Sequence, residues 1–104
     1  MSDRDRRAAK RVTYFAEAEL EGIDTSRRLQ VRLSDLSTGG AFIDARTVLP
    51  AGTVAKLKFT VLGQEINVLA EIRYSMPSFG MGVRFLDLAP KDRVFVELFI
   101  SQQG

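Results

Sequence analysis

Residues 28–34 read Arg-Leu-Gln-Val-Arg-Leu-Ser, and this stretch decides the fold. Its apolar side chains, Leu29, Val31 and Leu33, alternate strictly with polar ones. Successive side chains of a β-strand point to opposite faces, so this period of two predicts a strand with one buried face and one solvated face.

The same alternation recurs in three longer segments. Their apolar faces consist of Val12, Tyr14, Ala16, Ala18 and Leu20, then Ala55, Leu57, Phe59 and Val61, and then Ile66, Val68, Ala70, Ile72 and Tyr74. Phe15 is an exception on the polar side of the first segment. Shorter strands are expected at 41–45 and 81–86, and Gly- or Pro-containing turns separate the segments. About six antiparallel strands follow from this pattern.

A sheet with one apolar face and no helices between its strands must curl on itself or pair with another sheet. We therefore expect a mainly β protein, a six-stranded antiparallel barrel over residues 12–88. The last segment changes period, because Pro90 suits a first helical position and apolar residues then crowd the sequence. A C-terminal helix is expected at 89–103.

This helix is apolar around more than half of its circumference. We expect Val94, Phe95 and Leu98 to cap the barrel, which would leave Val96 and Ile100 poorly covered in a monomer. Two interpretations stay open: a well-buried terminal helix, or a helix that contacts a partner or forms a weak dimer.

Composition limits the chemistry that is available. The chain has 104 residues, enough for a single domain over 1–104, and it contains neither cysteine nor histidine. A disulfide framework, a thiolate metal site and a histidine general base are therefore excluded, and no metal or cofactor is expected. No apolar run approaches the roughly 20 residues that cross a bilayer, so we expect a cytoplasmic protein without membrane insertion.

Positive charge is concentrated at the N-terminus. Residues 1–11 hold five Lys/Arg against two Asp, which gives +3 and leaves −1 for the rest of a chain whose total is +2. A basic arm on a nearly neutral body favours a localised anion contact over a broad nucleic-acid-binding face.

The arm places Arg6, Arg7 and Arg11 directly before the first strand. In a helical turn, residues four apart face the same way, so Arg7 and Arg11 could grip one ligand together. Their planar guanidinium groups match phosphate oxygens and guanine edges. Taken alone, however, arginines with this spacing are also typical of a solvated surface.

A polar turn at 35–40 follows the strand that was quoted first. Asp35 and Ser37 could simply satisfy backbone donors at a hairpin corner. In the functional interpretation, the Asp35 carboxylate accepts hydrogen bonds from guanine N1 and N2, and Gly40 lets a base or phosphate approach the backbone. The arm and the turn together describe a site for an anionic guanine nucleotide.

Three motifs occur in order along the chain: Arg6-Arg7-x-x-x-Arg11, Asp35-x-Ser37-x-x-Gly40, and Gly80-Met81-Gly82-Val83-Arg84-Phe85 before the helix. In this arrangement the sequence resembles the PilZ family of cyclic di-GMP receptors over nearly its whole length. The resemblance implies a six-stranded barrel with a C-terminal helix.

The resemblance also assigns ligand-binding residues. Arg7 and Arg11 correspond to the arginine pair of the family, and Asp35, Ser37 and Gly40 correspond to its second motif.

Two further assignments rest on position alone. Gly82 corresponds to a glycine near the ligand, although a packing role fits it equally well. Arg6 adds charge beside the pair that would support two stacked ligand molecules. The chain departs from the family at Gly80, where some members place a large side chain, with Phe79 as a candidate substitute. It also departs at the helix start, where Ala89 offers no hydroxyl cap.

The resemblance implies a non-catalytic receptor and adaptor whose arm becomes ordered on binding cyclic di-GMP. Its signal would pass to an unidentified protein, in motility, chemotaxis, pili or exopolysaccharide production. One alternative is a ligand-independent interaction module of the same fold that docks through its helix. Another, less favoured, is a small barrel that binds single-stranded nucleic acid, because only Phe15 is an obvious outward aromatic residue within a strand.

Catalysis is the least favoured reading. Ser37 has no histidine to activate it, and Asp35 has no paired carboxylate nearby in the sequence. The segment Thr38-Gly39-Gly40 lacks the lysine of a phosphate-binding P-loop.

Overall fold

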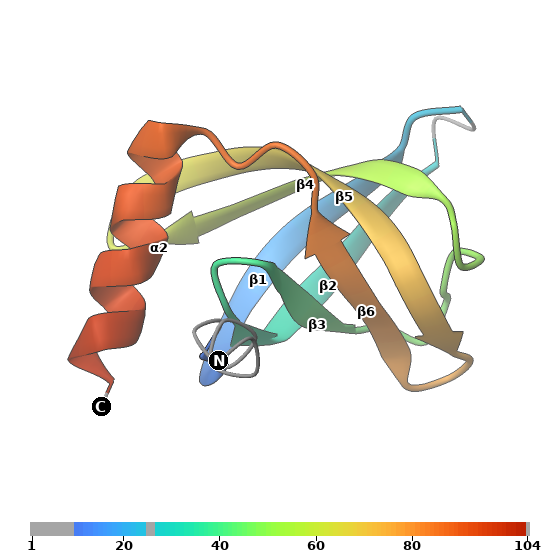
Figure 1. Cartoon of the computed structure of the whole chain (residues 1–104). Coiled ribbons are helices and arrows are strands. Elements are labelled where there is room, and N and C mark those ends of the chain that lie inside the picture. Colours follow the sequence, from blue (N-terminus) through green and yellow to red (C-terminus); the bar gives the residue numbers. More distant parts are fainter. Residues whose placement is uncertain (1–9, 25–26, 104) are drawn as a thin grey trace, which may run out of the picture.

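The computed structural model describes residues 10–24 and 27–103. In these ranges the elements are β1 (Val12–Gly22), β2 (Arg28–Leu36), β3 (Gly40–Asp44), β4 (Val54–Val61), β5 (Gln64–Met76), β6 (Gly80–Phe85) and α2 (Pro90–Gln102). The strands form a closed barrel in the order β1-β2-β3-β6-β5-β4, and each pair of neighbours is antiparallel (Figure 1). The predicted mainly β fold, a six-stranded barrel followed by a helix, is confirmed.

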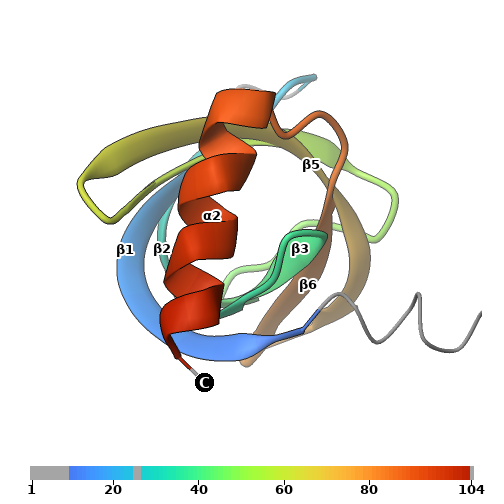
Figure 2. The same cartoon turned by 60° about the vertical axis from the view of Figure 1, so that its left-hand side comes forward.

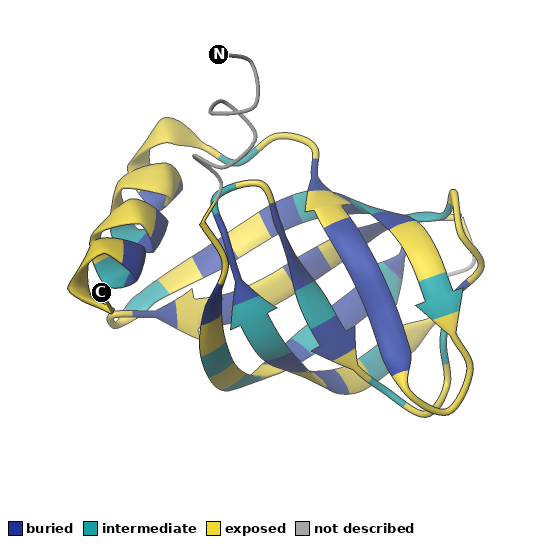
Figure 3. Cartoon of the chain, turned by 60° about the horizontal axis from the view of Figure 1, so that its bottom comes forward, coloured by how far each residue is buried: buried dark blue, intermediate teal, exposed yellow. Residues whose placement is uncertain are grey.

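The interior of the barrel is filled by the apolar faces of the strands. Leu20, Leu33, Leu57 and Ile66 are all 0% exposed, as the period of two predicted. Buried and exposed residues alternate along the strands in Figure 3. Because both the hydrogen bonds and the apolar faces are satisfied by closure, the sheet needs no second sheet to cover it.

A bulge in β2 changes the predicted turn. The pairing register of β2 with β3 shifts between Leu33 and Asp35, so β2 has one additional residue there. A separate shift in the pairing of β1 with β2, between Thr13 and Ala16, adds one residue to β1. A bulge adds one residue to a strand and moves the alternation by one position. Leu36 is therefore buried, β2 continues to Leu36, and the turn predicted at 35–40 is only three residues long, 37–39.

A third bulge, in β5, overturns the prediction for Tyr74. The register between β5 and β6 shifts between Ile72 and Tyr74. Tyr74 was expected on the inner face, but after the bulge it lies opposite Gly82 on the outer face and is 53% exposed.

Helix α2 lies across one opening of the barrel (Figure 2). The predicted capping face was wrong in part. Val96 and Ile100 are 0% and 8% exposed, whereas Val94 and Leu98 are 59% and 47% exposed. The buried positions include Asp92, with Phe95 and Phe99 packed beside them, and this set follows the i, i+3, i+4, i+7, i+8 spacing of an amphipathic helix.

Specific contacts fix the helix on the barrel. The ring of Phe99 packs on Tyr14 of β1 with 4.6 Å between the ring centroids. Near the other end, Asp92 Oδ1 accepts a hydrogen bond of 3.3 Å from Gln64 Nε2. As predicted, Ala89 gives no side-chain cap and Pro90 stands in the first turn. Within the described residues, no helix is long and apolar enough to cross a membrane.

Candidate functional site

Arg11 and Asp35 meet at the start of β1. Arg11 Nη1 donates to Asp35 Oδ1 at 2.6 Å, and Phe42 N donates to the same oxygen at 2.9 Å. The side chain of Asp35 is 26% exposed and that of Arg11 is 51% exposed. Asp35 is thus fixed through Oδ1, and no described residue donates a hydrogen bond to Oδ2.

Ser37 holds the turn together instead of facing outward. It is 2% exposed, and its Oγ accepts hydrogen bonds of 3.1 Å from both Gly39 N and Gly40 N. Its hydroxyl also lies 3.2 Å from the Gly40 carbonyl oxygen, to which it can donate. Ser37 therefore satisfies backbone donors at the corner of the hairpin, which was one of the two interpretations of the sequence. It affects the site by fixing the backbone of the turn.

Gly40 is required by the approach of β3 to β6. A Cβ at this position would lie 2.1 Å from the Val83 carbonyl oxygen, a backbone atom that cannot turn aside. Gly39 differs, because the nearest atom to its Cβ would be Ser37 Oγ at 3.9 Å. Gly40, and not Gly39, is therefore the glycine that the packing of β3 against β6 requires.

Five residues form one row across five neighbouring strands on the outside of the barrel. The register pairs Thr13 with Asp35, Asp35 with Phe42, Phe42 with Gly82 and Gly82 with Tyr74. We call this set the binding row. It brings residues from β1 and from β5 onto the same surface as the Arg11–Asp35 ion pair.

Gly82 serves packing within the binding row. A Cβ on Gly82 would lie 2.4 Å from Cζ of Tyr74 and 2.7 Å from its Oη, so the distal edge of the ring covers the glycine. Gly80 has the same relation to Phe42, whose ring atoms would lie 2.8 and 2.9 Å from an added Cβ. The rings of Phe42 and Tyr74 are 6.3 Å apart. The two glycines of β6 therefore leave space for two aromatic side chains.

Sequence reasoning missed Phe42 and Tyr74 as members of the site face. The signal that could have pointed to them is the spacing of Gly80 and Gly82. Residues two apart on a strand share a face, and two missing side chains on one face leave space for neighbours from adjacent strands.

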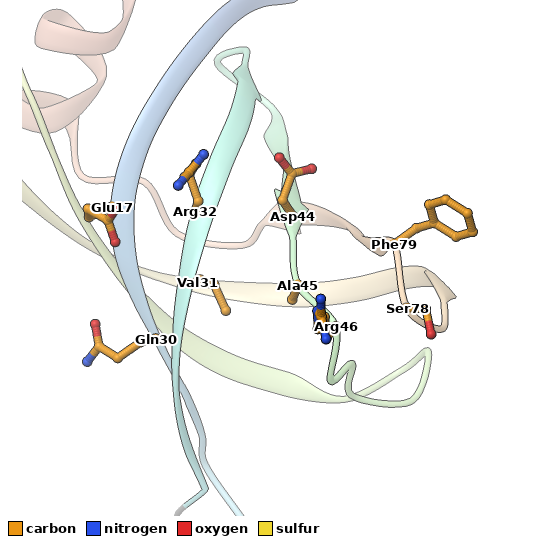
Figure 4. A pocket seen from close by; sticks show the side chains of 9 residues that line it. All are labelled: Glu17, Gln30, Val31, Arg32, Asp44, Ala45, Arg46, Ser78 and Phe79. Carbon is orange, nitrogen blue, oxygen red and sulfur yellow. The ribbon is translucent and has the colours of Figure 1, made fainter.

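A polar groove of about 390 Å³ lies on another part of the outer surface. Glu17, Arg32 and Asp44, which are paired across β1, β2 and β3, line it together with Arg46 and Phe79. In Figure 4 the ring of Phe79 is directed away from the other labelled side chains. None of the predicted ligand-binding residues that the structure describes lines this groove, so the groove is separate from the predicted site.

The base of the arm, the turn and the helix border one hollow of about 280 Å³. Lys10 and Thr38 line it from the barrel side, and Glu97, Ile100 and Ser101 line it from α2. A ligand on the arm and turn would therefore lie near the C-terminal half of the helix.

The structure places the predicted residues as follows. Arg11 and Asp35 are in contact, Ser37 and Gly40 form the adjoining turn, and Gly82 lies in the binding row. Arg6 and Arg7 fall outside the described residues.

A model of the PilZ domain matches residues 5–102, which is nearly the whole chain. The chain belongs to the PilZ family. The match includes all three predicted arginines of the arm and the turn after β2. Comparison with curated proteins gives no match.

Solved PilZ structures have the same fold. One similar structure is that of the Bacillus subtilis inhibitor of motility, MotI/DgrA, with a TM-score of 0.75 and 16% sequence identity. The alignment covers 94% of this chain and 51% of that chain. The chain thus spans about half the length of that relative.

Two others are similar. The PilZ domain of CeSA from a cellulose-synthesizing bacterium has a TM-score of 0.69 and 20% identity, covering 92% of this chain and 100% of that one. Borreliella burgdorferi PlzA, solved in complex with c-di-GMP, has a TM-score of 0.64 and 15% identity, covering 80% of this chain and 31% of that one.

Proposed function

We propose that this PilZ domain is a non-catalytic receptor for cyclic di-GMP. The observation that carries the proposal is the 2.6 Å contact between Arg11 and Asp35, because it brings the two sequence motifs together on one surface. PilZ domains are typically receptors for this nucleotide, and the PlzA relative was solved with it bound.

The two residues have complementary tasks. Asp35 is anchored through Oδ1, so its second oxygen faces a ligand with a fixed direction. A carboxylate there accepts hydrogen bonds from N1 and N2 of guanine. Arg11 uses Nη1 for the ion pair and is half-exposed, so its other N–H groups can donate to a phosphate.

The remaining predicted residues complete the proposal. Arg7 would share the phosphate contacts with Arg11, and Arg6 would support a second ligand molecule. Ser37 and Gly40 keep the turn in the conformation that presents Asp35. Ordering of the arm on binding stays a prediction, as does a cytosolic location.

An adaptor role is part of the proposal, with an unidentified protein as the recipient of the signal. The hollow between Lys10, Thr38 and α2 supports this route, because a change in the arm would reach the helix directly. Val94 and Leu98 form an exposed apolar stripe on that helix. The stripe also favours the second candidate, a ligand-independent interaction module.

Isothermal titration calorimetry with cyclic di-GMP tests the proposal, with GMP and a short single-stranded RNA as controls. We expect saturable heat for the cyclic dinucleotide alone. Arg7→Ala and Arg11→Ala should each lower the affinity about tenfold or more, because a charged hydrogen bond contributes roughly 1.5–3 kcal/mol. Arg6→Ala should change the number of ligands bound more than the first affinity.

Absence of heat from the folded wild-type chain would contradict the receptor and favour the ligand-independent module. Comparable, strongly salt-dependent binding of the RNA would favour a nucleic-acid-binding barrel. Turnover of the nucleotide would show that the protein is an enzyme.

A further inference from the structure

Tyr74 and Phe42 form an aromatic surface along the binding row: Phe42 is the neighbour of Asp35, and Tyr74 lies at the far end of the row, beyond Gly82. Tyr74 is 53% exposed and Phe42 is partly exposed, with 6.3 Å between their ring centroids and 33° between their planes. Exposed aromatic rings cost solvation unless something covers them, and a flat base is a natural cover because it has a π-face.

The glycines of β6 determine how this surface is presented. Because Gly82 has no side chain, the distal edge of Tyr74 lies over it, on the side of the row that leads to Asp35. Gly80 leaves room for the Phe42 ring in the same way. The rings lie over the two glycines of β6, and Tyr74 is the more exposed of the two.

The spacing along the row fits a dinucleotide. Neighbouring strands lie about 4.8 Å apart, so Gly82 is about 10 Å from Asp35, two strands away. A base that is hydrogen-bonded to Asp35 and a second base above Gly82 can then belong to one small ligand.

We propose that Tyr74, backed by Phe42, stacks on one guanine of cyclic di-GMP while Asp35 binds the edge of the other. This inference rests on the proposed function. It makes Tyr74 a residue that selects a two-base ligand over a mononucleotide, since GMP can use Asp35 or Tyr74 but not both.

Phe79 is the competing aromatic residue. It is 72% exposed, but it lies in the β5–β6 turn beside the end of β3, where its carbonyl oxygen accepts a hydrogen bond from Ala45 N at 3.1 Å. In Figure 4 its ring is directed away from the barrel surface. Phe79 is therefore a matched control for an exposed ring outside the binding row.

The composition offers a direct spectroscopic test. The chain has no tryptophan and two tyrosines, Tyr14 and Tyr74. In a Tyr14→Phe host, tyrosine emission comes from Tyr74 alone. We expect cyclic di-GMP to quench this emission with the same midpoint as its calorimetric titration, because a stacked guanine contacts the ring.

Affinity measurements complete the test. Tyr74→Ala and Tyr74→Leu should weaken cyclic di-GMP binding by about 10- to 100-fold, Tyr74→Phe should retain it, and Phe79→Ala should leave it unchanged. Gly82→Ala should also weaken binding, because its Cβ displaces the Tyr74 ring, and it should add little to Tyr74→Ala. Circular dichroism verifies that each variant is folded, and Tyr74→Leu keeps the apolar bulk if alanine disturbs the barrel.

Wild-type affinity in both Tyr74→Ala and Tyr74→Leu, with no quenching in the Tyr14→Phe host, would overturn the stacking role and leave the receptor proposal intact. Failure of the wild-type chain to bind cyclic di-GMP would overturn both.

Discussion

Asp35 and Arg11 form a 2.6 Å ion pair that joins the residue before β1 to the penultimate residue of β2. The pair sits on a short span of surface where a main-chain donor, Phe42 N, also holds the carboxylate. Since both partners are partly exposed, the pair contributes little to stability by itself, and its main consequence is orientation.

Asp35→Asn separates orientation from charge. The amide oxygen can still accept from Phe42 N, so the barrel should keep its stability, but the carboxylate that binds guanine donors is lost. We expect about a tenfold or greater loss of cyclic di-GMP affinity by calorimetry. Asp44→Asn, an exposed change on β3, is the control and should bind normally. Normal binding by Asp35→Asn would remove the carboxylate from the site.

Gly40→Ala should destabilise the domain. Its Cβ would lie 2.1 Å from the Val83 carbonyl oxygen, so β3 and β6 must separate, at a cost of about 1–3 kcal/mol or more in the free energy of unfolding. Gly39→Ala, with 3.9 Å to its nearest atom, should change this free energy by less than about 0.5 kcal/mol. Urea unfolding of both variants measures the difference, and equal stabilities would show that the strands relax freely.

The face of α2 that covers the barrel can be tested with two valines. Val96→Ala removes a fully buried side chain and should cost about 2 kcal/mol in the free energy of unfolding. Val94→Ala changes a residue that is 59% exposed and should cost less than about 0.5 kcal/mol. Thermal unfolding followed by circular dichroism distinguishes them. A larger loss of stability in Val94→Ala than in Val96→Ala would support the buried face that was expected from the sequence.

Tyr14 predicts how stability depends on alkaline pH. Burial raises the pKa of its hydroxyl above the ordinary value of 10.0, and the hydroxyl donates to the Thr60 carbonyl oxygen. The folded state therefore holds this proton more tightly than the unfolded state does. The stabilisation is fully present below about pH 10 and is lost as pH rises through the folded-state pKa.

Urea unfolding from pH 8 to 11 should accordingly show a fall in stability above pH 10 that Tyr14→Phe reduces. The variant should start less stable at neutral pH, because the hydrogen bond to Thr60 is missing. An identical alkaline slope in the two proteins would assign the pH dependence to other groups.

Most of the barrel could be predicted because the alternation of apolar and polar residues is continuous within each strand. The bulges could not be predicted, because no particular residue type marks the position of an additional residue in a strand. The bulge between Ile72 and Tyr74 is decisive, because it moves one aromatic ring from the core to the surface. For the helix, apolar residues at 94–96 and 98–100 permit more than one buried face, and packing against Tyr14 selects one.

The candidate site, like the fold, could be predicted from the sequence only in part. The order of the motifs predicted that Arg11 and Asp35 belong to one site; their side chains are in contact, and their role in ligand binding stays a prediction. The place of Tyr74 beside Gly82 depends on a pairing register between strands far apart in the sequence. Short motifs carry no such information.

Barrel closure has a consequence for recognition by other proteins. Among the described strands, each one is hydrogen-bonded to a neighbour on both sides, with β4 returning to β1. Unpaired edge is limited to short stretches, such as residues 12–17 of β1, which lie beyond the pairing with β4. An incoming peptide therefore finds little edge on which to extend the sheet by main-chain pairing. A protein that docks on this barrel would mainly contact its side chains, so point substitutions on the outer surface can remove a partner without touching the nucleotide.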